Sequence, residues 1–137
     1  MMRRRTLVVV LSLAILLVAA VYLLTNWPFS SVTHNVAITG ITVSSNQVQR
    51  GDLVNVTATL KNEGSVSENF NVSLYLNSSL LEMRPVVDLG SNNDGDVVFN
   101  WNTTTTAPAN YVISAEATHL VGESNVTDNV LTDGVVS

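Results

Sequence analysis

Apolar and polar residues alternate along most of the chain that follows residue 34. In residues 53–60 (LVNVTATL) every second residue from Val54 is apolar, and in residues 70–76 (FNVSLYL) the same alternation begins at Phe70. Because successive side chains of a strand point to opposite faces, this pattern predicts strands with one buried and one solvated face. Strands are expected at residues 35–43, 53–60, 70–76, 80–89, 97–102, 111–117 and 129–136.

Turn-forming residues separate these segments. Gly64, in the sequence Asn-Glu-Gly-Ser, is expected to allow a turn by adopting a positive φ. Pro85 has no N–H to donate to a neighbouring strand, so residues 80–89 are expected to form an edge strand. About seven short strands in roughly 100 residues predict an all-β fold, an Ig-like antiparallel β-sandwich, with Phe99 and Trp101 as its largest core side chains.

The N-terminal residues show a different pattern. Three arginines, Arg3–Arg5, precede an apolar run from Leu7 to Leu24 that contains no charge. As a helix rising about 1.5 Å per residue, this run would be roughly 27 Å long, which is close to the thickness of a bilayer core. The sequence therefore predicts one N-terminal transmembrane α-helix at the cell membrane, with the arginines in the cytoplasm and the C-terminal domain extracytoplasmic.

Three interpretations of this segment remain open. An uncleaved signal anchor is favoured, because the apolar run continues to Leu24, beyond the small residues Val18-Ala19-Ala20 at which a signal peptide could be cleaved. The others are a cleaved signal peptide and a pilin-like helix processed near Thr6, where a glycine would be expected. On the favoured interpretation, residues 1–27 are the basic start and helix, residues 28–34 a juxtamembrane linker and residues 35–137 the extracytoplasmic domain.

Charge and cysteine content exclude several functions. The chain has eleven acidic and six basic residues, and beyond residue 30 only Arg50, Lys61 and Arg84 are basic. An acidic body repels phosphate backbones, so no nucleic acid partner is expected. The absence of cysteine excludes disulfides and thiolate metal sites, so the domain must be held together by its core.

Five asparagines stand in Asn-X-Ser/Thr sequons, which accept N-linked glycans in exported proteins. They are Asn55, Asn71, Asn77, Asn102 and Asn125. Those inside predicted strands fall on the polar face, which suits a glycan because a sugar needs a solvated position. Chance is the alternative explanation, since a chain rich in asparagine and threonine forms sequons easily.

No pattern predicts catalysis or a cofactor. A Gly-rich phosphate loop is absent, and neither His34 nor His119 has neighbours in the sequence that would activate a nucleophile. The two histidines could share one pole of the domain, but without a third ligand no metal site is predicted for them. Residues 88–96 (DLGSNNDGD) favour a hairpin turn, because their spacing is not that of an EF-hand. Calcium is the alternative there, with oxygens from Asp88, Asn92, Asp94 and Asp96.

The order of these segments resembles the CARDB domain, a cell-adhesion-related domain of bacteria and archaea. The resemblance covers about residues 35–134, and it is carried by Gly51-Asp52, Asn62-Glu63-Gly64, Trp101, the Tyr-x-Ile-x-Ala strand from Tyr111, and Glu123 followed by Asp128-Asn129. It implies an Ig-like surface module without catalytic residues. The chain departs from the family in having Asn110 where glycine is frequent, and in having one copy of a domain that commonly occurs in tandem. Its scarcity of lysine and abundance of asparagine, threonine and valine look similar to archaeal surface proteins.

These observations lead to one favoured function and two alternatives. The favoured function is a membrane-anchored, outward-facing module that acts without catalysis in cell-surface interaction or adhesion, with other surface proteins or glycans as partners. The first alternative is a structural subunit of a surface filament, pilus or envelope assembly, which would make the chain a homo-oligomer. The second is an accessory single-pass subunit of a membrane complex.

Overall fold

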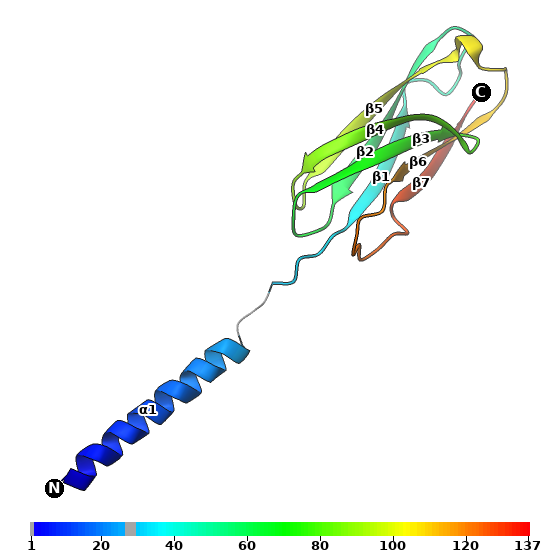
Figure 1. The fold of residues 1–137 in the computed structure, drawn as a ribbon. Helices are drawn as coiled ribbons and strands as arrows, with labels where there is room; N and C mark the ends of the chain where they lie inside the picture. The colour runs from blue at the N-terminus through cyan, green and yellow to red at the C-terminus, as the bar shows by residue number, and fades with distance from the viewer. Residues whose placement is uncertain (1, 27–29) are drawn as a thin grey trace. The chain divides into compact units, whose positions relative to one another are not determined.

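The computed structural model describes residues 2–26 and 30–137, which divide into two units, Met1–Ser31 and Val32–Ser137 (Figure 1). The first unit contains helix α1 (Met2–Thr25). Ser12, within the apolar run, donates from Oγ to the carbonyl oxygen of Val9 at 2.9 Å, as expected for a helix.

The expected transmembrane span is not confirmed. Within residues 2–26 and 30–137, no helix combines the length and the apolar character that crossing a membrane requires. Trp27 and Pro28, with which the helical segment was expected to end and the linker to begin, lie outside the described residues.

The second unit is a β-sandwich of seven strands, as predicted (Figure 1). One sheet has the order β1-β2-β5, the other has the order β4-β3-β6-β7, and the paired strands in both sheets are antiparallel. The strands are β1 (Val36–Val43), β2 (Leu53–Asn62), β3 (Glu68–Leu76), β4 (Ser79–Leu89), β5 (Asp94–Asn102), β6 (Tyr111–Ala117) and β7 (Val130–Val136).

The core lies between the two sheets and follows the alternation of the sequence. Val56 of β2, Leu74 of β3 and Trp101 of β5 are all buried in one cluster, while Asn55 and Asn71 face solvent. The phase of the alternation changes in β1, and the structure shows a register shift there between Ile38 and Gly40. Burial of these apolar faces supplies the main force that holds the two sheets together.

Strand β4 is an edge strand, as Pro85 predicted. Its alternation is weak because charged residues occupy positions that face the other sheet. Arg84 lies over the ring of Phe99 of β5, 5.8 Å from its centroid, and its Nε is 2.7 Å from Oε1 of Glu82. Charged residues facing inward on an edge strand disfavour pairing with a further strand, so this edge is protected.

Tyr111 forms a tyrosine corner at the end of the sandwich where β2 begins. Its hydroxyl donates to the carbonyl oxygen of Ala107 at 2.8 Å, and its ring packs edge-on against Trp101 with 5.4 Å between the ring centroids. After Asn102 the chain forms a short 3-10 helix (Thr103–Thr105), and the Asn102 side chain caps it by accepting from the backbone N of Thr104. These contacts are structural.

Candidate functional site

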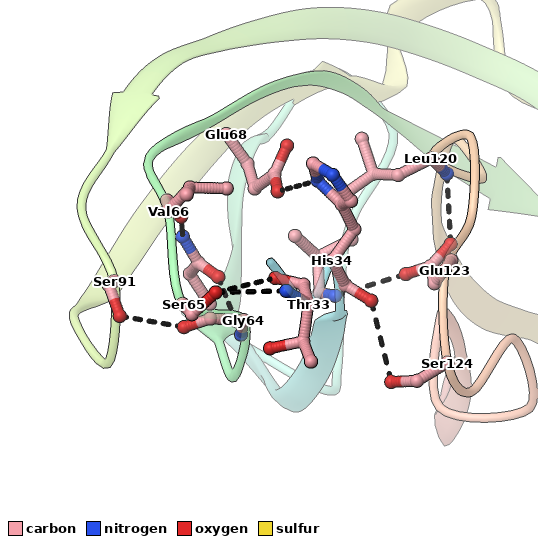
Figure 2. Close-up of polar contacts among 12 residues, drawn as sticks. Thr33, His34, Gly64, Ser65, Val66, Glu68, Ser91, Leu120, Glu123 and Ser124 are labelled. Carbon is pink, nitrogen blue, oxygen red and sulfur yellow. Dashed lines mark hydrogen bonds and ion pairs between the residues drawn. The ribbon is translucent and has the colours of Figure 1, made fainter. Parts of the chain in front are cut away.

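Polar side chains gather at the opposite end of the sandwich, where residues 32–35, 62–68 and 118–129 meet. We call this region the Asn62 end. The chain leading into β1 is fixed there by two hydrogen bonds to Ser65 of the β2–β3 loop. Ser65 N donates to Thr33 O, and Thr33 N donates to Ser65 Oγ, both at 2.9 Å (Figure 2). This end therefore joins segments that are far apart in the sequence.

Asn62 is fully buried, and its side-chain amide makes three hydrogen bonds. Its Nδ2 donates to the carbonyl oxygens of Val66 and Leu89, each at 2.7 Å, and its Oδ1 accepts from Gly64 N at 2.9 Å. One side chain thus connects the end of β2, the following loop and the end of β4. The Asn-x-Gly pattern singled out in the sequence has a structural reason, which is to close this end of the sandwich.

Gly64 is required by close packing and not by the positive φ that the sequence suggested. The glycines with a positive φ are Gly51, Gly122 and Gly134. A Cβ atom on Gly64 would lie 2.6 Å from the carbonyl oxygen of Thr33, because the chain that leads into β1 passes directly over the loop.

His34 and Glu68 form a polar pair above this loop (Figure 2). His34 Nδ1 lies 2.5 Å from Oε1 of Glu68, a carboxylate on a residue that is only 7 % exposed. The other histidine, His119, is exposed and lies beside Tyr75, Met83 and Glu116 on the outer surface of the four-stranded sheet.

Glu123 takes the place of a neighbouring strand along part of β1. Its Oε1 accepts from the backbone N of Val36 at 3.0 Å, and its Oε2 accepts from Leu120 N at 2.9 Å and from Asn129 Nδ2 at 3.0 Å. The carbonyl oxygen of Asp128 accepts from Ile38 N at 2.8 Å. The sequence alone did not predict that this loop covers the β1 edge. The one feature of the sequence that pointed to Glu123 was its place in the family resemblance.

Asp128 and Glu63 lie on either side of Asn35. Asn35 Nδ2 is 3.1 Å from Oε2 of Glu63 and 3.4 Å from Oδ2 of Asp128, and Asn125 Nδ2 donates to the same Asp128 oxygen at 2.7 Å. The side chain of Asn125 also bonds to the backbone, because its Oδ1 accepts from Thr127 N. Two buried oxygens, Oδ1 of Asp128 and Oδ1 of Asn129, have no hydrogen-bond donor among the described residues.

The residues expected as an alternative calcium site surround the β4–β5 turn. Asp88 and Asn92 have positive φ values of 57° and 58°, and Asn93 N donates to Gly90 O across the turn. The side chains of Asp88, Asn92, Asp94 and Asp96 are all exposed. Over residues 2–26 and 30–137, no group of three or more histidine or acidic side chains is arranged to hold a metal ion. Calcium at this turn stays a prediction.

All five sequon asparagines are exposed, but their side-chain nitrogens differ. Asn77 Nδ2 donates to Asn110 O at 3.1 Å, and Asn125 Nδ2 donates to Asp128 as described above. The other three, Asn55, Asn71 and Asn102, point outward from strands and have no recorded bond from Nδ2 within the described residues.

Comparison with known proteins identifies the family. The CARDB family model matches residues 32–133, which include all seven strands apart from the end of β7. The chain belongs to the CARDB family. No protein of curated function matches its sequence.

Solved structures of CARDB domains have the same fold. A CARDB domain from Pyrococcus furiosus, crystallised in complex with di-metal ions, is 25 % identical, with a TM-score of 0.59 over 76 % of this chain and 91 % of that chain. A domain from Methanosarcina acetivorans, named provisionally as part of a cell surface protein, is 27 % identical, with a TM-score of 0.60 over 76 % of this chain and 90 % of that chain. A β-glucosidase from Erythrobacter marinus is similar in fold alone, at 16 % identity and a TM-score of 0.58 over 79 % of this chain and 17 % of that chain.

Proposed function

We propose that this CARDB protein is an outward-facing, non-catalytic module for cell-surface interaction, attached to the membrane by its N-terminal segment. Family membership and the Methanosarcina acetivorans relative support a role at the cell surface. The uncharged run from Leu7 to Leu24, which follows three arginines, supports attachment with the domain outside.

The difference between the two outer faces of the sandwich is the observation that carries this proposal. On the four-stranded sheet, large apolar side chains are exposed at Leu80, Met83, Val112, Val130 and Val135. On the three-stranded sheet, the outward positions of β2 and β5 are mostly polar, with Leu53 and Val98 as the large apolar exceptions. Exposed apolar side chains that share one face are typical of a contact surface.

Contact through this sheet face is favoured over strand addition at β1 or β4. The N–H groups of Val36 and Ile38 on β1 are already bonded by the β6–β7 loop, and β4 contains Pro85 and inward-facing charges. The partner that fits such a face is another surface protein or a glycan, which would cover the apolar side chains and contact Tyr75 between them.

The first test measures whether the domain is exposed on intact cells. Because the chain has no native cysteine, a thiol reagent would label only a cysteine introduced into it. We expect a full-length Ser67→Cys variant, with its cysteine in the exposed β2–β3 loop, to react with a membrane-impermeant maleimide on intact cells. A Thr6→Cys variant is the matched control and should react only after the cells are permeabilised. Labelling of Thr6→Cys alone on intact cells, or of neither variant, would contradict the proposed orientation.

If the domain is exported in a host that glycosylates, we expect N-linked glycans. Asn55, Asn71 and Asn102 should be modified in preference to Asn77 and Asn125. At the last two positions the nitrogen that would carry the sugar already donates a hydrogen bond. We expect Asn71→Gln to lower the intact mass of the native protein by one glycan, whereas Asn77→Gln changes it only by the substitution. A mass equal to that of the bare polypeptide would show that no sequon is used.

A further inference from the structure

We propose that two copies of the chain associate through strand β5, which pairs antiparallel with its own copy about Val98 and joins their three-stranded sheets into one continuous sheet. The interface is the outer edge of β5 (Asp94–Asn102), the edge that does not pair with β2, and we call it the β5 edge. It is separate from the exposed apolar side chains of the four-stranded sheet. The inference does not depend on the proposed role at the cell surface.

Every second residue of β5 directs its backbone N–H and C=O groups away from β2. At one end of the strand Asn62 N donates to Asn93 O at 3.0 Å, so the odd-numbered residues bond to β2. At the other end Thr103 N donates to Asp52 O at 3.1 Å, which gives the same phase. Alternation in an antiparallel pair then turns the even-numbered residues outward. Among residues 2–26 and 30–137, no partner is recorded for the outward N–H groups, which belong to Asp94, Asp96, Val98, Asn100 and Asn102.

The other sheet edges are each blocked or interrupted. On β1 the N–H groups of Val36 and Ile38 are bonded by the β6–β7 loop, and β4 contains Pro85 and inward-facing charges. Strand β7 is bent at Gly134, which has a φ of 72°, where its pairing with β6 shifts register. In contrast, β5 contains neither proline nor a basic residue, and its register with β2 is regular along its length. An edge left open in this way is a template for a further strand.

The outward side chains of β5 show why the added strand is a second copy. The strand reads DGDVVFNWN, with acids at its start and amides at its end. When Val98 lies opposite its own copy, Asp96 of each chain lies opposite Asn100 of the other. A carboxylate then accepts from an amide on both sides of the centre, and the two valines form an apolar pair between them. Val98 is 41 % exposed in the single chain, so it is available for that contact.

The inward positions and the acids select the same register. Pairing about Val98 places Gly95 of each copy opposite Trp101 of the other, so the smallest residue of the strand lies beside its largest. It also overlaps the whole of β5, which gives the greatest number of backbone hydrogen bonds. A shift that placed Asp96 opposite its own copy would bring like charges together, which disfavours that register. The β5 edge is therefore complementary to itself in one register.

Sedimentation of the full chain in detergent, produced in a host without N-glycosylation, tests the proposal. We expect the unsubstituted chain to form a dimer that dissociates on dilution. Asn100→Asp places a carboxylate opposite Asp96 at two symmetric positions of that dimer, so it should weaken dimerisation by about tenfold or more. The double variant Asp96→Asn with Asn100→Asp exchanges the two side chains and restores the pairing of acid with amide. It should dimerise as the unsubstituted chain does.

The matched control is Asn55→Asp, the same change at the exposed residue that pairs with Asn100 on β2. Because β2 lies between β1 and β5, this variant should keep the dimer. Cysteine substitution gives a second measurement. Hydrogen-bonded residues of an antiparallel pair have Cα atoms about 5.5 Å apart, a distance that a disulfide can span. Val98→Cys should therefore form an intermolecular disulfide under mild oxidation, whereas Asn55→Cys should not.

Three results would overturn the proposal. The first is an unsubstituted chain that stays monomeric at every concentration. The second is a dimer that Asn100→Asp leaves unchanged, since association through the N-terminal segment or the four-stranded sheet would behave in this way. The third is a double variant that dimerises no better than Asn100→Asp alone, because the charges would then not face each other across the β5 edge.

Discussion

Replacing Phe99 with alanine is expected to lower the free energy of unfolding by about 3–5 kcal/mol. The Phe99 ring is fully buried in β5 between the two sheets, and it also supports the Arg84 guanidinium at the β4 edge. Its removal would leave a cavity that the surrounding residues can only partly fill. Because small domains are stable by only about 5–15 kcal/mol, this single change should leave a substantial part of the protein unfolded at modest urea concentrations.

The control for this prediction is Val98→Ala, one residue earlier on the same strand. Val98 faces outward and is 41 % exposed, so its truncation should cost about 1 kcal/mol or less. Urea unfolding followed by tryptophan fluorescence would measure both variants. Similar midpoints for the two would mean that the inward and outward faces of β5 have been assigned incorrectly.

Gly64→Ala is expected to have the second largest effect, a loss of about 1–3 kcal/mol from one added methyl group. The new Cβ would lie 2.6 Å from the Thr33 carbonyl oxygen and 3.1 Å from the Asn35 nitrogen. Both are backbone atoms, so the clash can be relieved only by moving the chain that leads into β1. That movement would also disturb the bonds between Thr33 and Ser65.

Gly40→Ala provides the comparison. A Cβ on Gly40 would meet the Thr59 side chain at 3.7 Å, an ordinary contact, and Gly40 has no positive φ. We expect its stability to stay the same or to rise by up to about 1 kcal/mol, because alanine restricts the unfolded chain. Urea midpoints again distinguish the two variants. Equal tolerance of alanine at both glycines would contradict the close packing of the Asn62 end.

Much of the fold could be predicted because alternation is a local property. Val56 and Phe70 each have polar neighbours on both sides, and the structure buries both of them while exposing Asn55 and Asn71. The edge position of β4 followed from Pro85 for an equally local reason, since proline has no N–H to donate.

The candidate site could not be predicted in the same way. Asn35 contacts Asp128, which is 93 residues away, and Asn62 bonds to the carbonyl oxygen of Leu89, 27 residues away. Neither pair has a spacing that any periodic pattern would reveal. The sequence assigned Gly64 to a turn, and only the passage of Thr33 over that loop showed why a side chain is excluded.

The sequence by itself determined that the body of this protein is a β-sandwich, which residues fill its core and which face solvent, because side-chain direction along a strand depends only on residue order. Tertiary structure alone decided how the sandwich is closed. It brought Glu123 against the N–H of Val36, turned Arg84 toward Phe99 and left the Asp128 oxygen without a donor. Contacts of this kind depend on where distant segments meet in space, which is fixed only when the two sheets pack together.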